Sequence, residues 1–142
     1  MIDADVKNLV RRRASFRCEY CRLPQSVTEI PFHVEHIVAR QHGGADEPTN
    51  LALACDRCNL HKGTNLSGID PEAGCPVPLF HPRTDSWFDH FRFNDARIEG
   101  VTGTGRATVR LLQMNALRRV QLRARFLAAG LHREMFADES TR

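Results

Sequence analysis

The sequence predicts a small α+β domain in which short strands are flanked by a helix at each end. Residues 27–38 and 51–54 are rich in apolar and β-branched side chains, which is typical of short strands. Residues 4–15 and 105–130 instead carry apolar side chains at helical spacing. The chain has 142 residues, of which 42% are hydrophobic, so we expect residues 1–142 to form a single domain with its own core.

The first half of the chain divides into a helix, two strand-forming segments and a second helix. Asp5 is a candidate N-cap for the first helix. Pro31 either breaks the 27–38 segment or lies at the edge of its sheet. Residues 41–48 hold the Gly, Asp and Pro residues of a loop. We expect the second helix to begin at Asn59 and to run to about Leu66.

The second half begins with a proline-rich stretch, residues 71–82, which we expect to be irregular. An aromatic-rich extension covers residues 76–100, and its aromatic side chains are expected to form a satellite core, with a tight turn near Asn94. Residues 105–130 are predicted to be one long arginine-rich helix. Its predicted apolar stripe consists of Leu117, Val120, Ala124, Leu127 and Leu131.

Four of the five cysteines form two Cys-x-x-Cys pairs, Cys18/Cys21 and Cys55/Cys58. Four thiolates in two close pairs suit a tetrahedral Zn²⁺ ion, and zinc bound in this way is usually structural. The alternative is a pair of disulfides in a secreted domain. No export signal precedes the pairs and Cys75 is left over as a free thiol, so we favour zinc.

Charge and hydropathy indicate the kind of partner. The net charge is +3, the pI is about 8.8 and the mean hydropathy is −0.40. No apolar run reaches the ~20 residues of a membrane span, so we expect a cytoplasmic protein without membrane contact. Basic residues 11–13 and the C-terminal arginines flank a slightly acidic centre, a distribution that suits a polyanion. We expect Arg118, Arg119 and Arg125 to project away from the apolar stripe, free to meet phosphates.

The segment between the cysteine pairs carries side chains suited to phosphodiester hydrolysis. That reaction needs a nucleophilic water, a base and a cation that stabilises the developing charge. Neighbouring residues on a strand point to opposite faces, so we expect Glu35 to hold a metal and His36 to hold the water. We expect Asn50 to hydrogen-bond with the ring or backbone of His36, and Asn59 to bring its carboxamide oxygen to the metal of Glu35.

These residues together resemble the HNH endonucleases of the ββα-metal superfamily, in the branch with four zinc-binding cysteines. The resemblance covers residues 18–66. Its segments are Cys18-Glu19-Tyr20-Cys21, Val34-Glu35-His36-Ile37, His42-Gly43-Gly44, Asn50-Leu51 and Cys55-Asp56-Arg57-Cys58-Asn59-Leu60-His61-Lys62-Gly63. It implies a small ββα-metal core at residues 16–66, stapled by a four-cysteine zinc site, with an N-terminal flanking helix and the long C-terminal helix.

The resemblance also implies an activity, the cleavage or nicking of DNA with one divalent ion, Mg²⁺ or Mn²⁺, to leave a 5′-phosphate. His36 would be the general base and Asn50 the central asparagine that orients it. Glu35 and Asn59 would bind the catalytic ion, which makes the chain a His-Asn-Asn variant.

Two other functions stay open. A non-catalytic, zinc-stabilised nucleic-acid-binding module would use the cysteines and arginines but has no need of the His36 set. A nuclease subunit that requires a partner protein would keep the same residues and be inactive alone. The sequence also leaves open a homodimer, the target, and the roles of His33, His61 and Cys75.

Overall fold

The computed structural model describes residues 2–131. Its helices are α1 (Ala4–Arg13), α2 (Asp56–Lys62), α3 (Trp87–His90), α4 (Gly103–Leu111) and α5 (Leu117–Ala128). Its strands are β1 (His33–His36), β2 (Leu51–Ala54), β3 (Ser67–Ile69), β4 (Pro76–Pro78), β5 (Phe91–Asn94) and β6 (Arg97–Gly100). Short 3₁₀ turns cover Gln25–Val27, Arg40–His42 and Pro48–Asn50.

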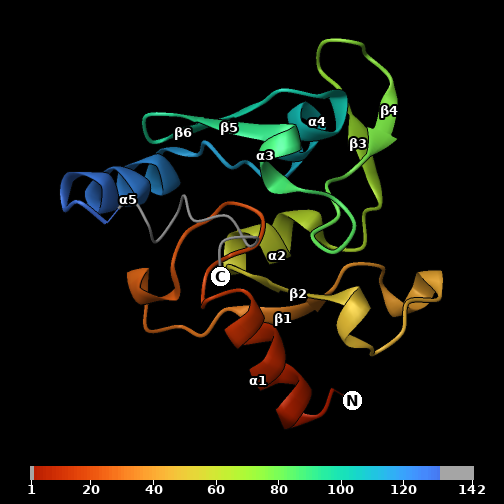
Figure 1. The fold of residues 1–142 in the computed structure, drawn as a ribbon. Helices are drawn as coiled ribbons and strands as arrows, with labels where there is room; N and C mark the ends of the chain where they lie inside the picture. The colour runs from red at the N-terminus through yellow and green to blue at the C-terminus, as the bar shows by residue number, and fades with distance from the viewer. Residues whose placement is uncertain (1, 132–142) are drawn as a thin grey trace.

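Within residues 2–131 the strands form three antiparallel hairpins, of which β1–β2 positions the candidate site. Glu35 lies opposite Ala52 and His36 opposite Leu51. Both α1 and α2 contact this hairpin, and Figure 1 shows α1 on one side of it and α2 on the other. The order strand, strand, helix confirms the predicted α+β class and is consistent with a ββα-metal core.

The helix boundaries differ from the prediction at both ends of this core. Helix α1 is capped by Asp3, whose side chain accepts a hydrogen bond from the backbone N–H of Asp5, so Asp5 is not the cap. Helix α2 begins at Asp56 rather than at Asn59, because the Cys55 sulfur accepts from the N–H of Cys58 and caps the helix three residues earlier. Asn59 therefore lies inside the helix.

The aromatic extension belongs to the main core, so the prediction of a satellite core was wrong. Trp87, Phe80 and Phe91 are buried in one cluster with the cysteines and Tyr20. The indole Nε1–H of Trp87 donates to the carbonyl of Tyr20 at 2.8 Å, which ties the extension to the first cysteine pair. The proline-rich stretch is also more regular than predicted, because β3 and β4 pair across residues 67–78.

The predicted long helix over 105–130 is two helices, α4 and α5. The chain turns between them, where Gln113 has a φ of 51°, in the left-handed region. The turn is stabilised by Asn115, whose side chain accepts from the N–H of Ile98 at 2.8 Å and donates to its carbonyl at 2.7 Å. Neither Gly nor Pro lies in residues 112–116, so no local signal marks this break.

Helix α5 packs through a different face from the predicted one. Leu117, the first residue of the predicted stripe, is 74% exposed. Arg119 and Arg123 are buried instead, and Arg123 donates to the backbone carbonyls of Ala96 and Met114. The prediction that Arg119 is free to meet phosphates was therefore wrong, because its guanidinium lies in the interior.

Candidate active site and metal centre

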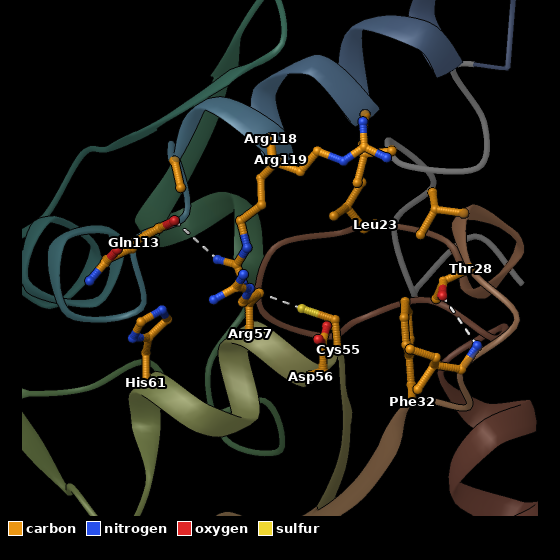
Figure 2. Close-up of a pocket in the computed structure, with 14 residues that line it drawn as sticks. Leu23, Thr28, Phe32, Cys55, Asp56, Arg57, His61, Gln113, Arg118 and Arg119 are labelled. Carbon is orange, nitrogen blue, oxygen red and sulfur yellow. Dashed lines mark hydrogen bonds between the residues drawn. The ribbon is translucent and has the colours of Figure 1, made fainter.

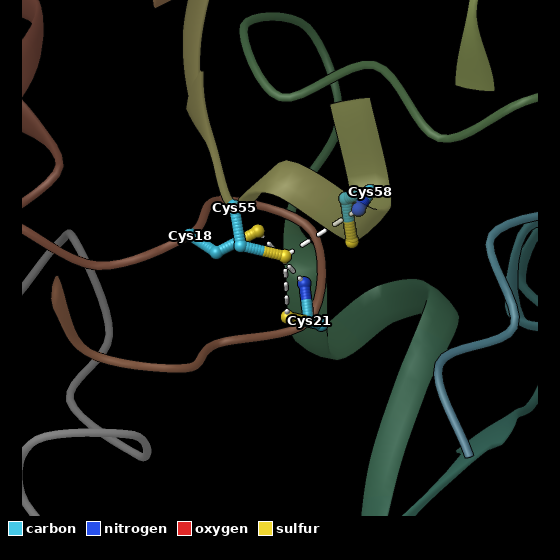
Figure 3. Close-up of side chains that lie close together, drawn as sticks. All are labelled: Cys18, Cys21, Cys55 and Cys58. Carbon is cyan, nitrogen blue, oxygen red and sulfur yellow. Dashed lines mark hydrogen bonds between the residues drawn. The ribbon is translucent and has the colours of Figure 1, made fainter. Parts of the chain in front are cut away.

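The four cysteines of the two pairs come together in one buried cluster (Figure 3). Their sulfurs all lie within 4.8 Å of one another, and Cys21 Sγ is 3.6 Å from Cys55 Sγ. A zinc ion with Zn–S bonds of about 2.3 Å places its four sulfurs roughly 3.8 Å apart. Cys18 and Cys21 come from the turn after α1, and Cys55 and Cys58 from the start of α2. The geometry and the donor chemistry therefore fit a structural zinc ion.

The cluster requires positive charge. Burial raises the pKa of the Cys18 and Cys58 thiols, whereas hydrogen bonds with the neighbouring cysteines lower the pKa of Cys21, so a cation is needed to hold all four sulfurs as thiolates. Arg119 supplies part of that charge, because its Nη2 lies 3.2 Å from the sulfurs of both Cys55 and Cys58. Burial alone would lower the pKa of Arg119, but the cysteine sulfurs raise it. Helix α5 thus reaches the metal centre through a cation that sequence reasoning assigned to the surface.

Glu35 points into the protein interior, where the residue is only 6% exposed. One carboxylate oxygen accepts a hydrogen bond from the Tyr20 hydroxyl, and the other lies 3.7 Å from the Lys62 ammonium. Lys62 also donates to the carbonyl of Ile37 at 2.8 Å. Burial raises the pKa of Glu35, although Lys62 and Tyr20 act in the opposite direction. Sequence reasoning did not identify either of these partners.

Asn59 and Glu35 carry the oxygen ligands that a hard cation prefers. Asn59 lies on α2, the helix that also supplies Lys62. Within residues 2–131, His, Cys, Asp and Glu side chains gather into a metal-binding cluster only at the four cysteines.

His36 lies on the other face of β1, with 19% of its side chain exposed. Its Nε2 is 2.7 Å from Oδ1 of Asp46, a residue that sequence reasoning read only as part of a loop. Arg40 also donates to Asp46, from Nη2 to Oδ2 at 2.9 Å. The hydrogen bond to His36 lowers the pKa of Asp46 to about 2, so this carboxylate is ionised.

Asn50 stabilises the loop that carries Asp46, rather than the His36 ring. Its Oδ1 accepts from the N–H of Val38, and its Nδ2 donates to the carbonyls of Val38 and Ala45, all at 2.9 Å. Gly44 makes this close packing feasible, since a Cβ there would lie 1.7 Å from the carbonyl oxygen of Val38. Asn50 therefore restrains the loop that carries Asp46, the residue in contact with His36.

His33, His61 and Cys75, whose roles the sequence leaves open, belong neither to the cysteine cluster nor to the contacts of Glu35 and His36. His33 is exposed on β1, and Cys75 is exposed and free. His61 lines a cavity of about 370 Å³ together with Arg57 and Arg118. Figure 2 shows Arg57 and His61 on α2, on the side that faces α5, the helix that carries Arg118 and Arg119. The cavity thus combines cationic side chains with an apolar wall.

Replacement of one sulfur ligand tests the zinc centre. Cys58→Ser leaves an incomplete ligand shell, and structural zinc contributes on the order of 10 kcal/mol in small zinc-dependent domains. We expect the variant to be insoluble or free of zinc, as measured by metal analysis and thermal melting. Cys75→Ser, at an exposed cysteine, should change neither quantity. A Cys58→Ser protein with full zinc content and an unchanged melting curve would contradict the assignment.

Replacement of Arg119 tests whether its hydrogen bonds to the cysteine sulfurs strengthen zinc binding. Arg119→Met removes the N–H···S bonds, and loss of such partners typically lowers metal affinity about 10- to 100-fold. We therefore expect zinc to pass to a competing chelator at correspondingly lower chelator concentration. Arg118→Met removes the same charge from the exposed neighbouring position and should leave the zinc affinity unchanged. Equal effects of the two substitutions would show that only the net charge matters.

A comparison with protein families identifies the segment that holds this site. A family model described as HNH endonuclease matches residues 18–65, which are 48 of the 142 residues. No curated protein and no solved structure matches the chain. Among residues 2–131, no helix has the length and apolar character needed to cross a membrane. The resemblance to the HNH endonuclease family is confirmed for the segment that holds the β1–β2 hairpin, α2 and a four-cysteine cluster positioned to bind a metal.

Proposed function

We propose that this protein is a metal-dependent HNH endonuclease that hydrolyses DNA phosphodiester bonds with His36 as the general base. The observation that carries the proposal is the environment of His36. Its partly exposed imidazole lies on the matched ββα segment, and one ring nitrogen is held by the ionised Asp46. A histidine that is oriented by a carboxylate and open to solvent on one side has the features of a proton acceptor.

In this mechanism the neutral imidazole takes a proton from a water molecule as that water attacks the scissile phosphorus. Asn50 restrains the loop behind the imidazole through the backbone of Val38 and Ala45. The base therefore does not have to be ordered when the substrate arrives, and such preorganisation is a large part of catalytic rate enhancement.

A divalent ion, Mg²⁺ or Mn²⁺, would be held by the Glu35 carboxylate and the Asn59 carboxamide. When bound, the ion would supply positive charge that stabilises the phosphorane and the leaving oxygen. The protein's own contribution on this face is the pair Tyr20 and Lys62, which orients the carboxylate and balances its charge.

The DNA backbone would be gripped by arginines on the protein surface. Arg57 and Arg118 are exposed and line the same cavity, and Arg125 is exposed farther along α5. Exposed guanidinium groups can pair with phosphates and release counterions, which makes binding dependent on salt but largely independent of sequence. Arg119 takes no part in this phosphate binding, because its guanidinium donates to the cysteine sulfurs.

Substitution of His36 tests the general base. His36→Ala removes proton transfer but leaves the zinc cluster and the surface arginines unchanged. We expect plasmid cleavage to fall by about 10²- to 10⁴-fold, while DNA binding, zinc content and melting temperature stay near those of the wild type. The matched control is His33→Ala, which removes an exposed histidine from the same strand. A His36→Ala protein that cleaves at the wild-type rate would rule out this mechanism.

Substitution of Glu35 tests the catalytic ion. Glu35→Gln keeps the shape of the side chain but removes the charge that attracts a cation. We expect cleavage to need a higher concentration of Mg²⁺ or Mn²⁺, measured as a shift of the metal titration curve at constant zinc content. Glu47→Gln, at an exposed glutamate in the loop, should leave the curve in place. Full wild-type cleavage in a chelator that leaves the zinc bound would show that no divalent ion is required.

A zinc-stabilised binding module is the second candidate, and one observation favours it. The Glu35 carboxylate already pairs with Tyr20 and Lys62, an arrangement that stabilises a fold without any ion. A wild-type protein that binds DNA with the expected salt dependence, but cleaves it with neither Mg²⁺ nor Mn²⁺, would establish this function. Recovery of cleavage on addition of a host lysate would instead indicate a missing partner subunit.

A further inference from the structure

The contact between His36 and Asp46 joins two segments that the β1–β2 hairpin brings together. Nε2 of His36 lies 2.7 Å from Oδ1 of Asp46. Arg40 binds the same carboxylate in a bidentate manner, from Nε to Oδ1 at 3.1 Å and from Nη2 to Oδ2 at 2.9 Å. The carboxylate is thus held on one side by a planar guanidinium and presents an oxygen to the imidazole on the other.

We propose that Asp46 is the positioning residue of the active site and that it fixes the proton of neutral His36 on Nε2, so that Nδ1 is the nitrogen that accepts the proton of the attacking water. The inference rests on the proposed function and adds to it the identity of the basic atom. It also adds a residue that neither the family match nor the sequence pattern assigned.

The tautomer follows from the chemistry of the two partners. An ionised carboxylate has only acceptor sites, so the imidazole nitrogen that faces it must be the donor. Asp46 is ionised at neutral pH, because its hydrogen bond with His36 lowers its pKa to about 2. A neutral imidazole has one N–H and one lone pair, so a proton held on Nε2 leaves the lone pair on Nδ1.

The loop that presents Asp46 is restrained by several independent contacts. Asn50 donates to the carbonyl of Ala45, the residue directly before Asp46. The N–H of Gly44 donates to the carbonyl of Ala39 at 3.1 Å, and Gly44 has no side chain to push the loop away from Val38. Asp46 is therefore placed by the backbone of the loop, and the Arg40 contact orients its carboxylate.

The first test reads the tautomer directly. Two-bond ¹H–¹⁵N correlation spectra of histidine-labelled protein distinguish Nε2–H from Nδ1–H at a pH where the ring is neutral. We expect His36 to be in the Nε2–H form in the wild type and to be a mixture of both forms in Asp46→Ala. Glu47→Ala removes a neighbouring exposed carboxylate that makes no cap contact and should leave the spectrum unchanged. A wild-type ring in the Nδ1–H form, or an Asp46→Ala ring that stays wholly Nε2–H, would overturn the proposal.

The second test reads catalysis. Misplacement of a catalytic group costs on the order of 10²-fold, so we expect Asp46→Ala to lower kcat by about 10- to 100-fold with little change in KM. Zinc content and melting temperature should match the wild type, because Asn50 still restrains the loop. Arg40→Ala keeps the carboxylate beside the imidazole and should have the smaller effect. A higher kcat, or a tighter KM alone, would show instead that Asp46 competes with the substrate phosphate.

The two tests separate the inference from the function on which it rests. An Nε2–H ring that depends on Asp46, in a protein that cleaves no DNA, would leave the positioning contact intact and refute the nuclease. Cleavage that depends on His36 but not on Asp46 would support the nuclease and refute the positioning role.

Discussion

Four cysteine sulfurs are buried together in the hydrophobic core, and the surrounding structure must balance their charge. Buried thiolates repel one another and lose hydration, so they persist only where cations face them. A zinc ion would supply two of those charges, and the Arg119 guanidinium supplies another from α5. Segments that lie far apart in the sequence are thereby joined: the turn after α1, the start of α2 and helix α5.

The second cysteine pair also determines where the candidate chemistry lies. Because Cys55 caps α2, the helix starts directly after β2, and Lys62 lies one turn beyond Cys58, next to Glu35. Glu35 and His36 are neighbours on β1 and point to opposite faces of the hairpin. The carboxylate therefore enters the dry side with Lys62, and the imidazole reaches the solvent side with Asp46. In the proposed mechanism, the residue that would bind the cation and the residue that would accept the proton therefore lie on opposite faces of one strand.

The aromatic extension enlarges the hydrophobic core that surrounds the β1–β2 hairpin. Trp87 donates to the backbone of Tyr20, and Arg83 pairs with the buried Glu19, which itself accepts from the N–H of Leu53 at 2.8 Å. These contacts attach the extension to the first cysteine pair and to β2. A ββα unit alone buries little apolar surface. The metal centre would offset that shortage with ligand bonds, and the extension offsets it with additional buried side chains.

The sequence alone determined the features that depend on local patterns. The cysteine spacing predicted the metal centre, the apolar segments predicted the α+β order, and the Glu35-His36 pair marked the candidate site. Tertiary structure decided what depends on contacts between distant residues. Arg119 was placed on the surface because a buried, paired guanidinium and a solvated one have the same sequence pattern. The break at residues 112–116 depends on Asn115 reaching Ile98, and the partner of His36 depends on a loop folding back over ten residues. Charge pairing and loop closure are properties of the packed chain, so only the folded structure could assign them.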